Sequence, residues 1–316
     1  MRTFVSVASY CDPLLPFTLG RAVATAAAPQ HLHFGVVDQS PATTPRTEAP
    51  GRGSRLSQVR VDPLDARGPC WARALAMSLY DGEAWFLQID SHMDFDPGWD
   101  ERLASQALAL GAPQRRVVLS SYPNAFALED GQVVRRPTTQ GVLAHVVRPG
   151  SAFEADHPVL AFEAHPVEAD VPLPGFHVGA GCLFASGDLV QALPYDPWFY
   201  FHGEEQALAL RLFTHGWDIF HPPGLPVHHL YNTPSSGTPP RPMHWDSDMD
   251  ARRPVSWWTL EQRSRQRLAA LVQGAALGVY GLGRERSVAD YAAFSGIDYL
   301  ARVLGPAAFQ PKPPGG

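Results

Sequence analysis

The most informative segment of the sequence is Trp85-Phe-Leu-Gln-Ile-Asp-Ser-His-Met-Asp-Phe-Asp-Pro-Gly-Trp99. It begins as an apolar run of strand length, and four metal-ligand candidates follow, namely Asp90, His92, Asp94 and Asp96. In an extended chain, side chains at i and i+2 share a face, so Asp90 and His92 can point at one ion while Ser91 turns away. An acid that ends a buried strand is costly unless a cation or hydrogen-bond donors satisfy it. The stretch therefore predicts a strand that ends in a metal site.

The residues after this site predict a helix. Asp96-Pro97 precedes an amphipathic run through Leu103 and Ala107. This order is typical of a capping residue followed by a first-turn proline. We therefore interpret Asp96 as a helix cap and keep Asp90 and His92 as the metal ligands.

Composition limits the class of protein. The 316 residues are 45% hydrophobic, which is enough for one large domain or two ordinary ones, and the net charge of −6 argues against a nucleic-acid partner. Three widely spaced cysteines, an odd number, fit neither a disulfide framework nor a cysteine zinc site, so we expect a reducing compartment. No apolar run approaches the ~18 residues of a membrane span. These features predict a soluble, cytoplasmic protein.

The N-terminal sequence indicates an α/β fold. A strand at 3–9, a helix within 14–28 and a strand at 31–38 form a βαβ unit, which favours a parallel sheet. Ligands of such sheets bind at the carboxyl ends of the strands, where Ser9, Tyr10, Asp12 and Asp38 fall. For these polar residues, and above all for Asp12 before Pro13, ordinary turn chemistry is an equal alternative.

Several later segments can be placed from their patterns. Residues 40–57 and 233–253 are rich in Pro, Thr, Ser and Gly, so we expect mobile loops, the second with the composition of an active-site lid. Gly68-Pro69 opens a helix whose Arg73 could bind an anion or simply lie on the surface. The span 122–175 looks irregular, with short strands at 142–147 and 159–162.

An aromatic turn at 199–202 leads into a helix that begins with Glu204 and Glu205 and ends near Gly216. Paired acids beside aromatics suit sugar hydroxyls, although an acid at a helix start also suits the helix dipole. A short strand at 217–220 is broken by Pro222-Pro223-Gly224, and either of the paired histidines that follow, His228 and His229, could supply another metal ligand. The chain then turns helical at 256–277 and again within 281–304.

Six motifs, taken together, resemble one family: Ser9-Tyr10 with Asp12, the run 34–39, the run 68–73, Gln88-Ile-Asp-Ser-His92, Gly203-Glu204-Glu205 and Gly281-Leu-Gly283. It is the family of polypeptide α-N-acetylglucosaminyltransferases that modify hydroxyproline in a cytoplasmic ubiquitin-ligase adaptor, with their bacterial relatives. The resemblance runs from residue 4 to about residue 298. It implies a GT-A glycosyltransferase fold, with residues 1–254 as the catalytic domain and residues 255–316 as a small helical extension.

The resemblance also implies a site. The donor would be UDP-GlcNAc, with Mn²⁺ or Mg²⁺ bound by Asp90, His92 and His229, and with His228 as the rival third ligand. The residues implied to contact the donor are Ser9, Tyr10, Asp12, Asp38, Arg73 and Ser91.

The implied chemistry retains anomeric configuration by front-face attack, with the leaving phosphate as base. Glu204 and Glu205 would hold the sugar and stabilise oxocarbenium charge. The acceptor could be a peptide, a glycan or a small molecule, because the segments that would shape it match little.

Two alternatives stay open. The chain could be a catalytically silent module that binds a glycan on its aromatic turn. A metallohydrolase fits less well, because the sequence has no His-Glu-x-x-His motif.

Overall fold

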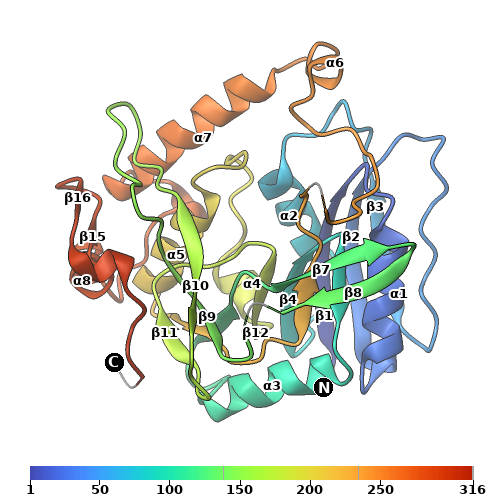
Figure 1. Cartoon of the computed structure of the whole chain (residues 1–316). Coiled ribbons are helices and arrows are strands. Elements are labelled where there is room, and N and C mark those ends of the chain that lie inside the picture. Colours follow the sequence, from blue (N-terminus) through green and yellow to red (C-terminus); the bar gives the residue numbers. More distant parts are fainter. Residues whose placement is uncertain (138, 234, 315–316) are drawn as a thin grey trace.

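The computed structural model describes residues 1–137, 139–233 and 235–314. Its centre is an eight-stranded sheet in the order β11-β13-β6-β12-β4-β1-β2-β3 (Figure 1). The strands are β1 Thr3–Tyr10, β2 Leu32–Gln39, β3 Arg55–Arg60, β4 Trp85–Asp90, β6 Val117–Ser120, β11 Leu173–Gly175, β12 Cys182–Ser186 and β13 Asp218–His221. Seven of these strands are apolar and largely buried, as in other α/β sheets, whereas the edge strand β3 is polar and only partly covered.

The expected βαβ unit is confirmed. Strand β1 pairs in parallel with β2 and with β4, so the strand ends that carry Ser9, Asp38 and Asp90 lie at one edge. Strand β12 enters between β4 and β6 and runs antiparallel to both, and β11 is antiparallel to β13. The sheet is therefore mixed, with its parallel half on the N-terminal side.

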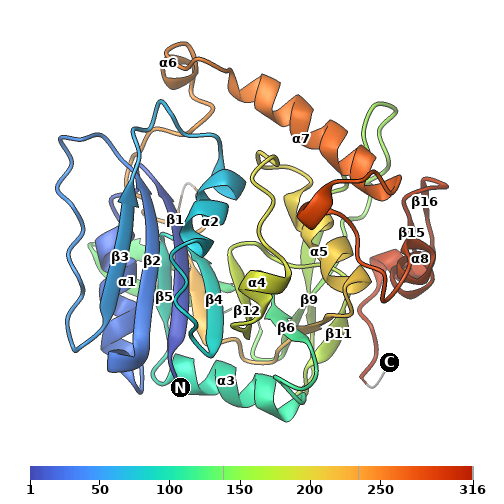
Figure 2. The ribbon, with the colours of Figure 1, turned by 180° about the vertical axis from the view of Figure 1, so that it is seen from behind.

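Helices cover both faces of the sheet (Figure 2). Helices α1 (Leu15–Thr25) and α3 (Trp99–Ala109) share one apolar core with β1, β2 and β4. Helices α2 (Pro69–Met77), α4 (Leu189–Ala192) and α5 (Glu204–Thr214) lie on the opposite face. Cores on both faces hold the sheet rigid at the edge where the polar residues gather.

The interpretation of Asp96 as a helix cap is wrong. Helix α3 begins at Trp99, and its N-cap is Gly98, which has a left-handed backbone with φ of 70°. Asp96 instead belongs to the extended segment before the helix, where its backbone N–H donates to the carbonyl of Pro226. Its carboxylate forms ion pairs with Arg102 and Arg135.

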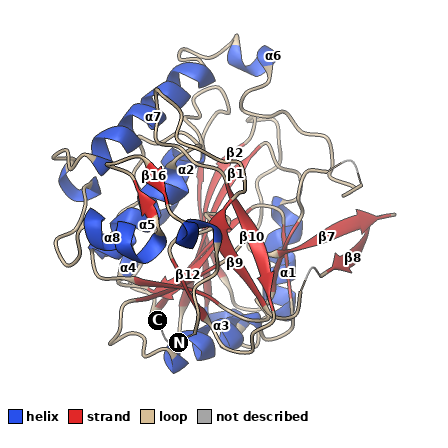
Figure 3. Ribbon diagram, turned by 60° about the vertical axis from the view of Figure 1, so that its left-hand side comes forward, coloured by secondary structure: helices blue, strands red, loops and turns tan. Residues whose placement is uncertain are grey.

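The span 122–175 is more regular than its composition indicates. Strands β7 (Asn124–Glu129) and β8 (Gln132–Arg136) form a hairpin that projects from the body (Figure 3). Its turn is Asp130-Gly131, with φ of 49° and 77°, the backbone that this dipeptide favours in two-residue hairpins. Strand β9 (Val142–Val147) is confirmed, and its partner β10 (Phe162–Val167) starts where the expected strand ends.

The C-terminal residues pack beside α5. Helices α7 (Trp257–Val272) and α8 (Val288–Ser295) contribute to the core that also contains α5. The rest of 281–304 is not helical and ends in a small hairpin of β15 (Ile297–Asp298) and β16 (Val303–Leu304). Short 3-10 turns lie at Pro29–His31, Gly278–Tyr280 and Pro306–Phe309.

The two expected loops behave differently. Residues 41–54 form no helix or strand, although β3 begins within the predicted loop. Residues 235–253, called the strap below, hold the short helix α6 (Ser247–Asp250) and are tied to the body by the buried side chains His244 and Arg253. None of the helices described is long and apolar enough to cross a membrane.

Candidate active site

Two short strands bring the candidate metal ligands together. The chain leaves β4 at Asp90, passes His92 and enters β5 (Met93–Phe95), which pairs antiparallel with β14 (Val227–His229). This register sets His229 opposite Met93 and therefore next to His92. Neighbouring residues of a strand point to opposite faces, so His228 and His229 separate.

The geometry places His229, and not His228, in the cluster. His229 Nε2 lies 3.2 Å from Asp90 Oδ2, and its ring centroid is 4.7 Å from that of His92. One ligand atom from each of Asp90, His92 and His229 lies within 4.8 Å of the others. His228 contacts Asp96 at 3.1 Å on the other face.

Asp12 lies directly behind His92. Its Oδ2 is 2.7 Å from His92 Nδ1 and accepts 2.6 Å hydrogen bonds from Ser91 Oγ and Arg241 Nη1. A proton on Nδ1 leaves the lone pair of the other ring nitrogen free, which is how a carboxylate commonly orients a metal-binding histidine. The hydroxyl of Ser91 is thereby committed to Asp12.

The carboxylate of Asp90 stays ionised. Burial alone would raise its pKa, but the hydrogen bond from His229 and the charge of Arg73 outweigh burial and hold that pKa far below its ordinary value. Burial also lowers the pKa of His229, despite Asp90, so this imidazole is neutral at pH 7. Its Nδ1 is buried and has no hydrogen-bond partner in the part of the chain that the structure describes. One carboxylate and two imidazoles, all able to offer lone pairs, fit a divalent cation.

Arg73 connects this cluster to the start of α5. From α2 it donates to Asp90 Oδ1 at 2.8 Å and to Glu204 Oε1 at 2.6 Å, and it is 4% exposed. Glu204 also accepts hydrogen bonds from the thiol of Cys70 and from the hydroxyl of Tyr195. Because Arg73 is buried between two carboxylates, it fixes both of them.

Glu205 is held by a separate set of groups. Its Oε2 accepts from the hydroxyl of Tyr122 and its Oε1 from the N–H of Ala180, both at 2.7 Å, and His177 Nε2 lies at 3.4 Å. Burial would raise the pKa of Glu205, yet His177 and Tyr122 lower it, whereas burial raises the pKa of Glu204 in spite of Arg73. Adjacent acids with pKa values pushed apart are a feature of acid–base sites.

Gly181 sets the distance between β12 and Asp90. A Cβ atom built on Gly181 would lie 2.5 Å from Asp90 Oδ2, inside any normal contact. Two glycines, Gly179 and Gly181, precede β12. The absence of a side chain at Gly181 makes room for the Asp90 carboxylate.

The remaining predicted residues lie toward the ends of β1 and β2. Ser9 is fully buried and its hydroxyl has no partner within the described ranges, and the Asp38 carboxylate forms a 2.8 Å ion pair with Arg60. The hydroxyl of Tyr10 accepts from Arg253 of the strap, and burial raises the pKa of Tyr10 to about 12.

Sequence reasoning missed several residues of this site. They are Cys70, Tyr122, His177, Tyr195, Arg241 and Arg253. Cys70 lies in the motif 68–73, on the same helix as Arg73, but a cysteine there carries no signal of its contact with Glu204. The other five belong to no motif and reach the site from distant segments. Gly181 alone carried a signal, as one of two glycines before an apolar strand.

Comparison with known structures identifies the fold. A structure of GalNAc-T7 with UDP, GalNAc and Mn²⁺ aligns with a TM-score of 0.53 at 12% identity, over 76% of this chain and 45% of that one. Residues 1–349 of S. aureus TarS align with a TM-score of 0.41 at 13% identity, over 71% of this chain and 60% of that one. The chain therefore spans less than half of the GalNAc-T7 chain. The mixed sheet with helices on both faces is the GT-A fold.

No curated protein matches the sequence. The family model described as "Glycosyltransferase (GlcNAc)" matches residues 42–301, well over half of the chain, including the segments that carry Asp90, His92, Glu204, Glu205 and His229. The chain therefore belongs to this GlcNAc glycosyltransferase family and has the GT-A fold.

Proposed function

We propose that the protein is a metal-dependent, retaining glycosyltransferase that moves GlcNAc, or a related sugar, from a UDP-sugar to an acceptor hydroxyl. The observation that carries this proposal is the cluster of Asp90, His92 and His229 at the end of β4. Two imidazoles beside one carboxylate suit Mn²⁺ better than Mg²⁺, which prefers oxygen ligands. A structure of GalNAc-T7 with UDP, GalNAc and Mn²⁺ supports the same class of donor and ion.

The side chains around the cluster have distinct roles in this proposal. A bound cation would neutralise charge on the departing diphosphate. Asp12 holds His92 in one tautomer, and Arg73 keeps Asp90 ionised and Glu204 in place. Glu205, ionised and partly exposed, is positioned to accept hydrogen bonds from sugar hydroxyls and to stabilise positive charge on the anomeric carbon.

The donor nucleotide would bind beside β1 and β2. Ser9, Tyr10 and Asp38 lie at or near the carboxyl ends of these strands, where α/β sheets bind ligands. Among the described residues the hydroxyl of Ser9 has no partner, but it is fully buried, so a nucleotide would reach it only if this edge of the sheet opened. The nucleotide would compete with Arg60 for the Asp38 carboxylate and with Arg253 for the Tyr10 hydroxyl.

Within the family, we propose a place among the polypeptide α-N-acetylglucosaminyltransferases, with a peptide hydroxyl as the first acceptor class to test. The motifs around Asp90 and Glu204 support this assignment. The free cysteines Cys11, Cys70 and Cys182 support a reducing, cytoplasmic setting.

The test is release of UDP from UDP-GlcNAc, UDP-GalNAc and UDP-glucose, each with Mn²⁺, with Mg²⁺ and with a chelator. We expect Mn²⁺-dependent release that Asp90→Asn and His229→Ala abolish. His228→Ala is the matched control, because His228 is adjacent in the same strand but faces Asp96. Full activity of the His229 variant would refute the assignment, and NMR of the first product anomer tests retention.

A silent binding module makes the opposite prediction. It would bind UDP or a glycan saturably without consuming any UDP-sugar. Metal-dependent turnover by the wild-type protein, lost in Asp90→Asn, excludes that alternative.

A further inference from the structure

A large cavity lies away from the metal cluster, between α2 and α7. Its volume is about 1150 Å³, and the residues that line it include neither Asp90, His92 nor His229. Pockets for small organic ligands are usually about 300–1,000 Å³. The cavity is therefore large enough for a ligand of that class, and it is separate from the site described above.

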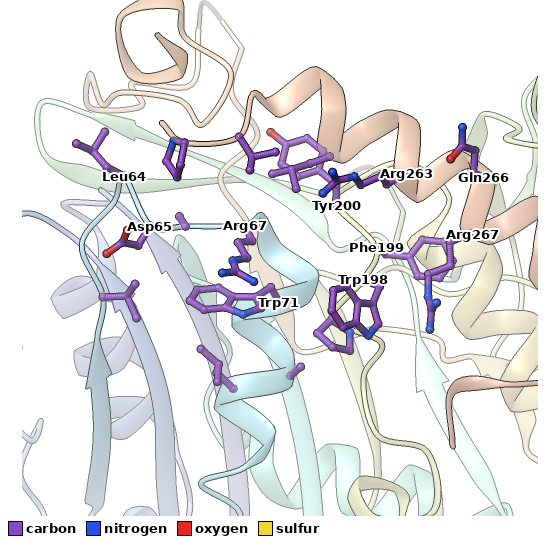
Figure 4. Close-up of a pocket in the computed structure, with 18 of the residues that line it drawn as sticks. Leu64, Asp65, Arg67, Trp71, Trp198, Phe199, Tyr200, Arg263, Gln266 and Arg267 are labelled. Atoms are coloured by element: carbon purple, nitrogen blue, oxygen red, sulfur yellow. The ribbon is translucent and has the colours of Figure 1, made fainter. Parts of the chain in front are cut away.

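The walls of the cavity are mainly apolar and aromatic (Figure 4). Trp71 and Leu75 line it from α2, Leu260 from α7, and Trp198 and Phe199 from the loop before α5. Trp198 is 62% exposed, which is unusual for a large aromatic side chain in a folded domain. A hydrocarbon or aromatic body would cover this apolar surface and gain free energy of transfer from water.

Four charged residues line the cavity, and three of them are positive: Arg67, Arg263 and Arg267, with Asp65 as the one acid. Arg67 lies near Trp71, and Arg263 extends from α7 on the opposite side of the space (Figure 4). Among the residues that the structure describes, neither forms an ion pair, whereas Arg267 is paired with Asp196 at 2.7 Å. Two unpaired guanidinium groups in a protein of net charge −6 are complementary to an anion.

We infer that this cavity binds a small anionic amphiphile, which has one apolar body and one carboxylate or phosphate group. The apolar body packs between Trp71, Leu75 and Leu260, and the anionic group is bound by Arg67 and Arg263. A peptide chain fits less well, because each of its residues brings a backbone donor and acceptor that these apolar walls leave unpaired. This site goes beyond the proposed transfer reaction and does not depend on it.

The test uses cis-parinaric acid, a fluorescent fatty acid that accepts energy from tryptophan, below its micellar concentration. We expect saturable binding with energy transfer from Trp71 and Trp198. Laurate and dodecyl phosphate should compete, and their relative strengths distinguish the two headgroups. Uncharged dodecanol should compete at least ten-fold more weakly, because hydrogen bonds to charged groups carry a large share of the affinity.

Variants locate the binding. Arg67→Ala with Arg263→Ala should weaken probe binding about ten-fold or more, and Arg252→Ala, another exposed arginine outside the lining, should not. Trp198→Phe should reduce energy transfer. Arg67 and Arg263 are both exposed, so the melting temperature of the double variant should equal that of the wild-type protein.

Four results would each overturn the inference. One is the absence of saturable binding, and another is equal affinity in the double arginine variant. The third is displacement of the probe by UDP with Mn²⁺, which would place the ligand in the donor site. Tighter binding of an acidic peptide than of laurate would also replace the amphiphile with a polypeptide partner.

Discussion

Replacing Gly181 with alanine should impair the candidate metal cluster without unfolding the protein. The new Cβ would lie 2.5 Å from Asp90 Oδ2, whereas ordinary contacts begin at about 3.4 Å, so the carboxylate must move by about 0.9 Å. Asp90 Oδ2 is the oxygen that lies 3.2 Å from His229 Nε2. The displacement therefore separates two of the three candidate ligands.

The size of the effect follows from this displacement. A misplacement of about 1 Å in an active site can cost about 100-fold in rate, and each ten-fold is about 1.4 kcal/mol of activation free energy. We expect kcat/KM for UDP release to fall about 10- to 100-fold, with a higher Mn²⁺ requirement. Alanine is compatible with the backbone here, since φ of Gly181 is outside the left-handed region.

The assay measures UDP release against Mn²⁺ concentration, with the melting temperature recorded for each variant. Gly20→Ala is the matched control, because the same methyl group meets nothing within 4 Å on α1. That variant should retain activity and gain about 0.5–1 kcal/mol of stability. Wild-type kinetics and metal dependence in Gly181→Ala would refute the reasoning, as would a loss of activity explained by unfolding.

Three further predictions concern the surrounding network. Tyr122→Phe removes a hydrogen bond that lowers the pKa of Glu205, so the acid limb of the pH profile of UDP release should move to higher pH, and an unchanged limb would contradict an ionised role for Glu205. Burial lowers the pKa of His244 to about 4 from an ordinary 6.5. As the pH drops from 6.5 toward 4, the unfolded chain therefore binds a proton at His244 that the folded chain does not, and the free energy of unfolding should fall. Protease cleavage within the strap should increase over the same range, less so in His244→Phe, and a flat cleavage profile would count against this reading. Arg73→Met leaves Asp90 and Glu204 without their shared buried cation and should cost about 3–5 kcal/mol of unfolding free energy, measured by urea denaturation.

Local patterns were sufficient for the elements near the site. The alternation at 3–9, the apolar run from Trp85 and the glycine before Pro69 each predicted the strand or helix that the structure contains. Asp96 shows the limit of such patterns. An acid before a proline is equally compatible with a cap and with an ion pair, and the neighbouring arginines Arg102 and Arg135 decided for the ion pair.

The β7–β8 hairpin and the strap show a second limit. Asp130-Gly131 was a readable turn signal, but the prolines around it made the span look irregular. The strap has the composition of a free loop, yet buried contacts of His244 and Arg253 fix its position. Composition describes what a segment can do alone, and docking depends on partners elsewhere in the chain.

From the sequence alone, Asp90 and His92 were predicted to share a face at the end of a strand, because the period of an extended chain is two residues. The sequence left His228 and His229 as rivals. The pairing of β5 with β14 separated them, and the same tertiary structure placed Asp12 behind His92 and Arg73 between Asp90 and Glu204. Spacing along the chain sets which side chains face the same way, whereas contacts between distant segments arise only from packing.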